Sequence, residues 1–494
     1  MVCYYWTILN YINVMEINNL YHLGMVGNTG SIDNMFLKSA LTKESDLNTT
    51  DFILKWVNER KSNVKFSIEK ISLNYLNNWI VDIVSNNITH KSGKFFSIEG
   101  VTVETNYGYK GCWDQPIINQ PEMGFLGMLT KNIKGVLHFL IQAKIEPGNL
   151  NVVQLSPTLQ ATKSNYTCVH NGKKPLYLEY FNGEKNVEIL IDQIQSEQGA
   201  RFLHKRNRNI IVKIKDDEYI RVSDNFIWVT LGQLKELMKY DNLVNMDTRT
   251  VISSISFDND KNFNLLISET SPRKTYYSLI QDKEPLHNLN YLISWITNLK
   301  FKYELNVSSK NIKDIEDWFY NGESISHKDN KYFSVIGVNV NIDNREVINW
   351  DQPMIKPSQD GVIGLIIKKI NGVYHFLVQA KVEIGNLDIL ELAPTVQCLT
   401  GNYRTGLNEY SVPFIGYILN AKEEQIWHKS YQSEEGGRFF QEQNLNMIVE
   451  VDDKFNEELP ENYCWMTLNQ LNMFMKFNNY LNIGLRSLLS LIKF

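Results

Sequence analysis

The chain has little cysteine, no long apolar run and no block of charge of one sign. Its five cysteines, among 494 residues, are scattered, odd in number and never spaced Cys-x-x-Cys. We therefore expect neither a disulfide framework nor a zinc site, and this usage predicts a cytoplasmic protein. No apolar stretch is long enough to span a membrane. A net charge of −5 without a lysine- or arginine-rich run indicates no nucleic-acid surface.

Several motifs with known chemistry are missing. No Gly-x-Gly-x-x-Gly follows a predicted strand, so no dinucleotide-binding fold is indicated, and the sequence has neither a P-loop nor a Gly-x-Ser-x-Gly elbow. His90 and His327 lack a second histidine or cysteine at ligand spacing, which argues against a metal site. Residues 1–25 are apolar but lack the charged start and cleavage site of a signal peptide, so we interpret them as an N-terminal extension.

What the chain does contain is a long internal repeat. The tetrapeptide "WDQP" at Trp113–Pro116 recurs at Trp350–Pro353, 237 positions further on. At the same offset "HFLIQAKIEPGNL" matches "HFLVQAKVEIGNL", "SEQGARF" matches "SEEGGRF" and "WVTLGQL" matches "WMTLNQL". Such a long match indicates a duplicated domain of about 230 residues rather than a solenoid of short repeats. We predict copy one at residues 26–257, a linker at 258–274 and copy two at 275–494.

Local patterns predict an α+β fold in each copy. "GVLHFLIQAK" alternates like a strand, and the segments around Pro157 and Pro394 are typical of further strands. Thr230-x-x-Gln233 and Thr467-x-x-Gln470 are capping boxes that open helices. Residues 290–303 predict another helix. Each copy is therefore expected to run helix, several strands, helix.

One face of the predicted strand carries a polar row that both copies share. The row consists of His138, Gln142, Lys144 and Glu146 in copy one, and of His375, Gln379, Lys381 and Glu383 in copy two. Such a row is either a solvated face or the lining of a pocket, and its presence in both copies favours the pocket. Trp79 and Trp318 leave a similar choice open, between a core aromatic and a plate that stacks on a nucleobase.

The strings "WDQPIINQPEMGFLG", "QAKIEPGNLNVVQLSPTLQATKSNYT" and "DNLVNMDTRTVIS" closely resemble the NDP-hexose 2,3-dehydratases. Copy two matches with "QAKVEIGNL", "APTVQCLTGNY" and "EEGGRF", so the resemblance covers nearly the whole chain after the extension. It implies two tandem, duplicated Nudix-like domains in a homodimer. It also implies a dTDP-linked 4-keto-6-deoxyhexose as substrate. The glutamate-rich metal box of Nudix hydrolases is absent, so we do not expect metal-dependent pyrophosphate cleavage.

The chemistry that the resemblance implies follows from the sugar. The C4 ketone acidifies the C3 proton, a base removes this proton, and the C2 hydroxyl leaves as water. The resulting enol tautomerises to a 3,4-diketo-2,6-dideoxyhexose that is still attached to its nucleotide. No net redox change occurs, so no cofactor is expected. A downstream 3-ketoreductase or aminotransferase would consume the product.

The resemblance also implies site residues. We expect Tyr166 or Tyr403 to transfer the proton, with Glu146 or Glu383 as alternatives. Substrate-binding candidates in copy one are Trp79, Lys144, Thr162, Lys163, Ser164, Asn165 and Tyr166. Those in copy two are Trp318, Lys381, Gln397, Cys398, Leu399, Asn402, Tyr403 and Arg404.

The copies differ where Lys163-Ser164 is replaced by Thr400-Gly401. One copy could therefore be catalytic and the other a binding site, and the sequence leaves open which. A non-catalytic nucleotide-sugar binding protein is the alternative function.

Overall fold

A computed structural model describes residues 32–167, 173–257, 284–343, 347–399, 401 and 412–492. The helices and strands of copy one are α2 (Ile32–Leu41), α3 (Thr50–Ser62), β1 (Phe66–Ile71), β2 (Trp79–Val81), β3 (Ile88–His90), β4 (Ser97–Thr105), β5 (Cys112–Asn119), β6 (Gly124–Ile133), β7 (Val136–Ile145), β8 (Val153–Ser156), β9 (Leu159–Ala161), α4 (Lys163–Tyr166), β10 (Glu188–Ser196), β11 (Phe202–Leu203), β12 (Arg206–Lys213), β13 (Phe226–Thr230), α5 (Leu231–Leu237) and α6 (Met246–Ser253). Those of copy two are α9 (Leu289–Lys302), β14 (Leu305–Lys310), β15 (Trp318–Tyr320), β16 (Ser324–His327), β17 (Phe333–Ile342), β18 (Asn349–Pro357), β19 (Gly361–Ile370), β20 (Val373–Lys381), β21 (Glu391–Ala393), β22 (Val396–Cys398), α10 (Ile415–Leu419), β23 (Ile426–Ser433), β24 (Gln443–Val451), β25 (Tyr463–Thr467), α11 (Leu468–Met475) and α12 (Ile483–Ser490).

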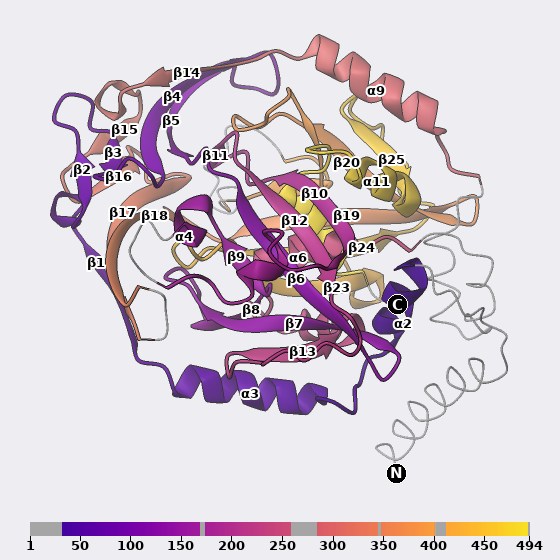
Figure 1. Ribbon diagram of the computed structural model, residues 1–494. Helices are drawn as coiled ribbons and strands as arrows, with labels where there is room; N and C mark the ends of the chain where they lie inside the picture. Colours follow the sequence, from indigo (N-terminus) through magenta and orange to yellow (C-terminus); the bar gives the residue numbers. More distant parts are fainter. Residues whose placement is uncertain are drawn as a thin grey trace, which may run out of the picture.

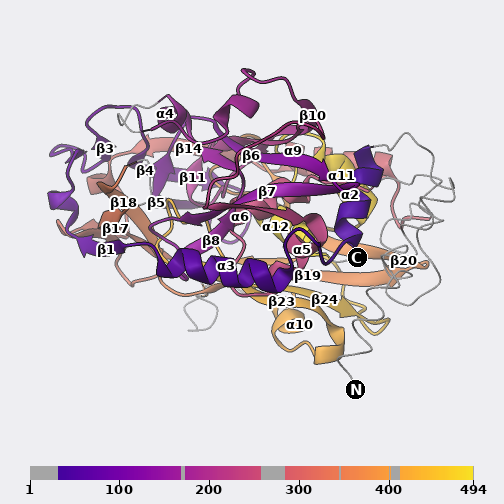
Figure 2. The ribbon, with the colours of Figure 1, turned by 60° about the horizontal axis from the view of Figure 1, so that its bottom comes forward.

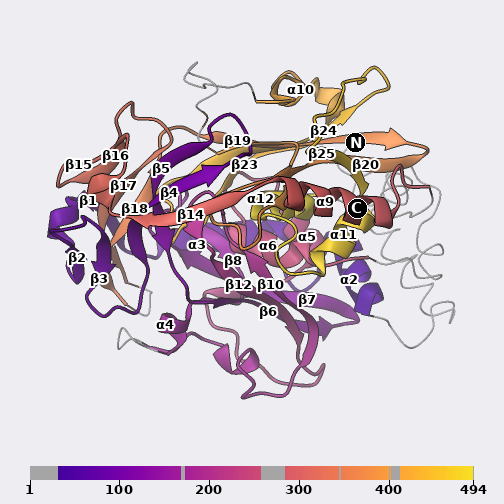
Figure 3. The ribbon, with the colours of Figure 1, turned by 90° about the horizontal axis from the view of Figure 1, so that it is seen from above.

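Each copy contributes one seven-stranded sheet, and the two sheets have the same topology. In copy one the strand order is β10-β12-β6-β7-β13, with β8 on β7 and β9 on β6. In copy two it is β23-β24-β19-β20, with β21 and β25 on β20 and β22 on β19. Helices α6 and α12 pack against each other between the two sheets, as Figure 3 shows.

The two smaller sheets exchange one strand between the copies. Strand β1 of copy one pairs antiparallel with β17 of copy two, and β14 of copy two pairs antiparallel with β4 of copy one. The exchanged strands run on from helices α3 and α9, which lie along opposite edges of the molecule in Figure 1. A Cβ atom at Gly337 or Gly100 would lie 2.6 Å from a carbonyl oxygen of the incoming strand, so both positions need glycine. The copies are thus interlocked in space.

The WDQP repeat joins one copy to the other. The indole of Trp79 donates a 2.7 Å hydrogen bond to the carbonyl of Asp351, and that of Trp318 donates a 3.0 Å bond to the carbonyl of Asp114. Each aspartate therefore binds the tryptophan of the opposite copy. The two smaller sheets lie together at one end of the molecule, away from α10, as the view in Figure 2 shows.

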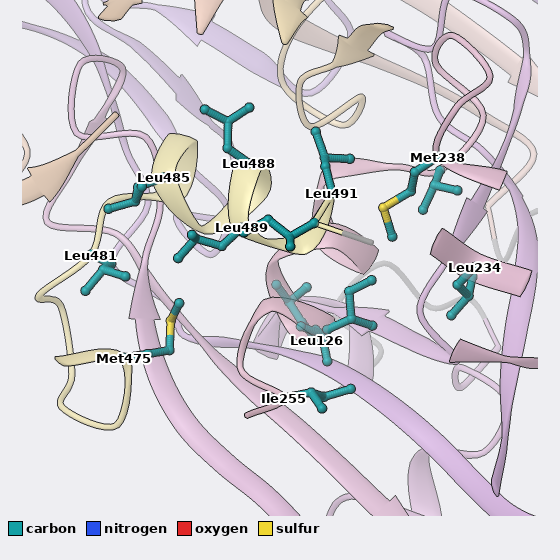
Figure 4. Close-up of a cluster of buried hydrophobic side chains, with 14 of the residues drawn as sticks. Leu126, Leu234, Met238, Ile255, Met475, Leu481, Leu485, Leu488, Leu489 and Leu491 are labelled. Atoms are coloured by element: carbon teal, nitrogen blue, oxygen red, sulfur yellow. The ribbon is translucent and has the colours of Figure 1, made fainter. Parts of the chain in front are cut away.

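The main core is also shared. Copy one provides Leu126, Leu234 and Met238, and copy two provides the leucines of α12 with Met475. Figure 4 shows these side chains together around the last helix. Neither copy encloses this cluster alone, so burial of apolar surface favours the joined state of the two halves.

Most of the local predictions are confirmed. Strand β7 covers the predicted alternating segment, both capping boxes are formed, and α9 lies within one residue of the predicted helix. The mixed α and β composition and the two-part organisation hold as well. The predicted extension 1–25 and linker 258–274 lie outside the described residues. No helix in the described part of the chain is long and apolar enough to cross a membrane.

Candidate active site

The polar row of β7 ends in a buried ion pair. The ammonium of Lys144 lies 3.6 Å from Glu146 Oε1, and the amide of Gln160 on β9 donates a 3.0 Å hydrogen bond to the same oxygen. Lys144 also donates to the carbonyl of Gln160. Only 9% of Lys144 and 5% of Glu146 is exposed, so this end of the row is not a solvated face. His138 stands apart, because its Nε2 bonds Ser45.

A loop from copy two closes over Glu146. The backbone N–H of Gly148 donates a 2.7 Å hydrogen bond to the carbonyl of Gly436, and that of Gln441 donates a 2.9 Å bond to the carbonyl of Gly148. A Cβ atom at Gly436 would lie 3.0 Å from Cβ of Glu146 and 2.3 Å from Asn149 Oδ1. Because only glycine fits here, the loop can approach Glu146 closely. The site is therefore built from both copies.

This loop carries an arginine and a glutamate to the site. The guanidinium of Arg438 stacks 4.1 Å from the ring centroid of Phe96 and donates to Gln120 Oε1. Burial lowers the pKa of Arg438, and the carboxylates of Glu435, Glu146 and Glu122 oppose that shift. Burial, and then the charge of Glu146, raise the pKa of Glu435 to about 7. Both loop residues keep part of their surface exposed, so the cluster reaches solvent here.

The predicted "TKSNY" segment reaches the same cluster through Ser164. The hydroxyl of Ser164 donates a 2.8 Å hydrogen bond to Glu122 Oε2, and its backbone N–H donates a 3.2 Å bond to the same oxygen. Lys205 donates to the carbonyl of Glu122. Burial lowers the pKa of Lys205 to about 8, against the opposing charge of Glu197. A neutral or easily neutralised lysine is common in sites that handle protons or anions.

The inner end of the cluster is Asp247, in the first turn of α6. Asn245, the N-cap of this helix, donates to Ser156 Oγ at 3.3 Å and to Gln160 Oε1 at 3.2 Å. Burial raises the pKa of Asp247 well above its usual range, and Glu197, Glu435 and Glu146 add to the shift while Lys144 opposes it. We define site one by its members, Lys144, Glu146, Gln160, Glu197, Lys205, Asp247, Glu435 and Arg438.

Copy two forms the related site two. Lys381 lies 3.7 Å from Glu383 Oε1, which accepts a 3.1 Å hydrogen bond from Gln397. The backbone N–H of Gly385 donates a 2.8 Å hydrogen bond to the carbonyl of Gly199, so a loop of copy one closes this site. That loop brings Arg201, whose charge faces Glu442, Glu383 and Glu434.

The two sites differ in their acids and bases. At the repeat offset, Asp247, Glu435 and Lys205 of site one correspond to Gly484, Gln198 and Glu442 of site two. In site two, Gln198 donates a hydrogen bond to Glu434. The matching pair in site one is Glu435 and Glu197, which are both carboxyl groups. Site two therefore keeps the Lys–Glu pair, lacks two of the carboxyl groups of site one and gains another at Glu442. Across the described ranges, no group of three or more His, Cys, Asp or Glu side chains is arranged to hold a metal ion.

The other predicted residues lie as follows. Tyr166 is partly buried at the end of α4, with its ring 5.4 Å from that of Phe125, and Lys163 is exposed. Trp79 and Trp318 are 9% and 5% exposed and pack among core aromatics, which favours the structural alternative for both. Cys398 and Leu399 lie at the end of β22, while Asn402, Tyr403 and Arg404 lie outside the described residues.

Sequence reasoning missed Asp247, Glu197, Lys205, Glu435 and Arg438. All five lie within or beside strings whose resemblance or repetition was noticed. A mismatch inside the repeat, where an acidic residue in one copy has a non-acidic partner in the other, marks Asp247, Lys205 and Glu435, whereas Glu197 and Arg438 have the same residue type in both copies. The approach of Glu435 and Arg438 to Glu146 could not be seen, because it depends on the loop that crosses between copies.

Comparisons with known proteins agree with one another over most of the chain. The family profile described as NDP-hexose 2,3-dehydratase matches residues 50–255 and 289–492. A dTDP-4-dehydro-6-deoxy-alpha-D-glucopyranose 2,3-dehydratase of Saccharopolyspora spinosa is 42% identical over 456 residues, which cover 92% of this chain and 93% of that protein. A protein of the same name from Amycolatopsis orientalis is 39% identical and covers 93% of this chain and 93% of its own length. Another from Streptomyces violaceoruber is 38% identical and covers 89% of this chain and 96% of its own length.

Proposed function

The chain belongs to the NDP-hexose 2,3-dehydratase family, and from this premise we propose that it removes the C2 hydroxyl of dTDP-4-keto-6-deoxyglucose as water. The product is the dTDP-linked 3,4-diketo-2,6-dideoxyhexose. The observation that carries the assignment to a site is the buried carboxylate of Glu146, held between Lys144 and Gln160 and covered by Arg438. Such a fixed carboxylate in a cluster of cations suits proton removal next to a ketone.

Glu146 is the base in this mechanism. It removes the C3 proton, and Lys144, beside it, stabilises the negative charge that develops on the C4 oxygen. Arg438, at the partly exposed rim, and the buried Lys205 bind the diphosphate, while the Thr162–Tyr166 segment contacts the nucleotide sugar. Tyr166, at the end of this segment, is the second candidate for the base.

Site one carries the reaction, and site two binds a nucleotide sugar without turning it over. Support comes from the replacement of Asp247 and Glu435 by Gly484 and Gln198 in copy two. Elimination needs a base and an acid, and site two has no carboxyl group at either of these two positions. Site two retains the Lys381–Glu383 pair and Arg201, the counterpart of Arg438, so two cations remain there to bind a diphosphate although Glu442 replaces Lys205.

Three further features belong to the proposal. Each copy has a Nudix-like fold, the protein is a cytoplasmic homodimer, and a 3-ketoreductase or aminotransferase consumes the product. The matched topology of the two large sheets supports the repeated fold. Among the described residues, Cys112, Cys398 and Cys464 form no disulfide, which suits a reducing compartment.

The test is to incubate purified protein with dTDP-4-keto-6-deoxyglucose in deuterated water. A 3-ketoreductase and NADPH trap the unstable diketone, and mass spectrometry and NMR identify the sugar. We expect a 2-deoxy sugar with deuterium at C2. Unchanged sugar with a competent trap would favour a binding protein instead, and magnesium-dependent release of thymidine monophosphate would indicate hydrolysis.

A further inference from the structure

We propose that Asp247 is the acid that gives its proton to the departing C2 hydroxyl. This inference rests on the proposed function and names a second catalytic residue in site one. It is carried by where the side chain lies, by an Oδ1 atom without a hydrogen-bond partner in the described structure, and by what replaces the residue in copy two.

Asp247 is held where the base is held. It belongs to the first turn of α6, and the N-cap of that helix, Asn245, bonds Gln160, which in turn bonds Glu146. Hydrogen bonds thus connect the N-cap of the helix that carries Asp247 to the base. The side chain is 2% exposed, and its Oδ1 atom has no hydrogen-bond partner within the described residues. A buried oxygen without a partner is rare in folded proteins and needs an explanation, such as a bound ligand.

The other carboxyl groups of site one are less suited to donate a proton. Glu197 accepts a 2.6 Å hydrogen bond from the amide of Asn207, and Glu435 accepts a 3.0 Å bond from the backbone N–H of Gly437. Arg438 also lies beside Glu435 and favours its ionised form. These contacts stabilise acceptors, whereas Asp247 has no donor aimed at Oδ1.

The charges around Asp247 keep it protonated. Carboxyl groups face it from Glu197, Glu435 and Glu146, and together with burial they raise its pKa. Lys144 and Arg249 are the cations that oppose them. The helix N-terminus also favours an ionised aspartate, but this effect is small beside full burial among three carboxyl groups. A neutral carboxylic acid at neutral pH is what a proton donor requires.

The step balances as follows. Glu146 takes the C3 proton and leaves an enolate with its charge on the C4 oxygen. The electron pair of the enolate then restores the C4 ketone and forms the C2–C3 double bond as the C2–O bond breaks. Asp247 transfers its proton to the leaving oxygen, so that water departs and Asp247 becomes a carboxylate. The C3 hydroxyl of the enol then loses its proton, C2 gains one, and the 3-ketone forms. Asp247 is reprotonated in this tautomerisation, and no oxidant or reductant is consumed.

Copy two provides an internal comparison. Its counterpart of Asp247 is Gly484, where a Cβ atom would lie 3.1 Å from Gln397 Oε1. Gln397 is the counterpart of Gln160, the glutamine that holds the base in copy one. The fold accepts a residue without a carboxyl group there, so removal of the Asp247 carboxyl tests chemistry more than folding.

The experiment compares Asp247→Asn with wild type on two substrates, dTDP-4-keto-6-deoxyglucose and its 2-deoxy-2-fluoro analogue. Fluoride can leave without receiving a proton, whereas the C2 hydroxyl group must receive a proton in order to leave as water. We expect the variant to lose about 10²- to 10⁴-fold in turnover of the hydroxyl substrate and to keep that of the fluoro analogue. Exchange of the C3 proton in deuterated water, which needs only the base, should persist.

Equal losses on both substrates, or no loss on either, would overturn the assignment. Asp247→Gly, which reproduces the residue of copy two, is the second variant if the asparagine protein folds poorly. Circular dichroism checks folding in each case. A wild-type protein that removes neither water nor fluoride would refute the proposed function itself. Failure of the proposed function and failure of the Asp247 assignment are therefore distinguishable.

Discussion

At the scale of single residues, the protein buries many ionisable groups, and most of them border the two sites. Burial raises the pKa of Glu434 and Glu435 to about 7 and that of Glu442 to about 8. In each case burial is the largest cause and nearby arginines offset it in part. Carboxyl groups with such values hold protons that an unfolded chain has released at the same pH, so stability depends on pH.

The first prediction concerns Glu442, whose two carboxyl oxygens are buried without a hydrogen-bond partner in the described structure. Between its ordinary pKa of 4.5 and about 8, the folded protein binds a proton that the unfolded chain does not. Stability from this group is therefore greatest at the acid end of that range and falls as the pH rises, by up to about 1.4 kcal/mol per pH unit.

Glu442→Gln should therefore raise the free energy of unfolding at pH 8.5 and change it little at pH 5. Urea unfolding at both pH values measures this. Glu424→Gln, at an exposed glutamate, is the control and should have little effect at either pH. A loss of stability in Glu442→Gln that is equal at both pH values would contradict the prediction.

What the sequence could and could not predict is visible at this same scale. Lys144 and Glu146 were found because alternation places them on one face of a strand, which is a local property. The sequence does not predict that the partly buried Glu435 and Arg438 belong to the site, because their approach to Glu146 depends on a loop from the opposite copy. The role of the tryptophans was left open for a similar reason, since their hydrogen-bond partners lie in the other copy.

At the scale of elements, the WDQP strands hold the loops that complete the sites. The amide of Gln352 donates a 2.6 Å hydrogen bond to the carbonyl of Gly437, next to Arg438. In copy one, Gln115 donates a 3.2 Å bond to the carbonyl of Ala200, next to Arg201. Each glutamine thus fixes the loop that enters the site of the opposite copy.

The second prediction follows from this arrangement. Gln352→Ala should lower kcat/KM about tenfold or more, because a loop displaced by about 1 Å misplaces Arg438 and Glu435 in site one. Gln115→Ala removes the matching bond of the loop at site two and should change the rate much less. Steady-state kinetics on both variants, with melting temperatures as the control for folding, measures the difference. Equal losses of activity would show that the glutamines only support the fold.

Element boundaries were predicted well where the signal is local. The capping boxes at Thr230 and Thr467 need only a short stretch of chain, and both are formed. Exchange of β1 and β14 between the copies was not predicted, because alternation identifies a strand but not its partner.

At the scale of the whole molecule, the duplicated halves depend on each other. Exchanged strands, a shared core and crossed site loops all join copy one to copy two. Arg249 of α6 donates to the carbonyl of Ser433, and Arg486 of α12 donates to that of Ser196. Either half alone would leave these buried partners unsatisfied, at a cost of about 1–3 kcal/mol each.

The third prediction is that separately expressed halves, divided within residues 258–283, do not fold alone. Co-expression should restore a folded, active complex, because the strand exchange can form between two chains as well as within one. Size-exclusion chromatography and the dehydration assay measure the outcome. A stable, monomeric copy one with full activity would contradict it.

The central claim is that this family member dehydrates its sugar in site one, with Glu146 as the base. The most direct measurement compares Glu146→Gln with the matched variant Glu383→Gln in the trapped dehydration assay, following both water loss and exchange of the C3 proton. We predict that Glu146→Gln loses both activities by about 10²-fold or more and that Glu383→Gln keeps most of both. Loss of both activities in Glu383→Gln, with turnover retained in Glu146→Gln, would place the reaction in copy two and contradict the account.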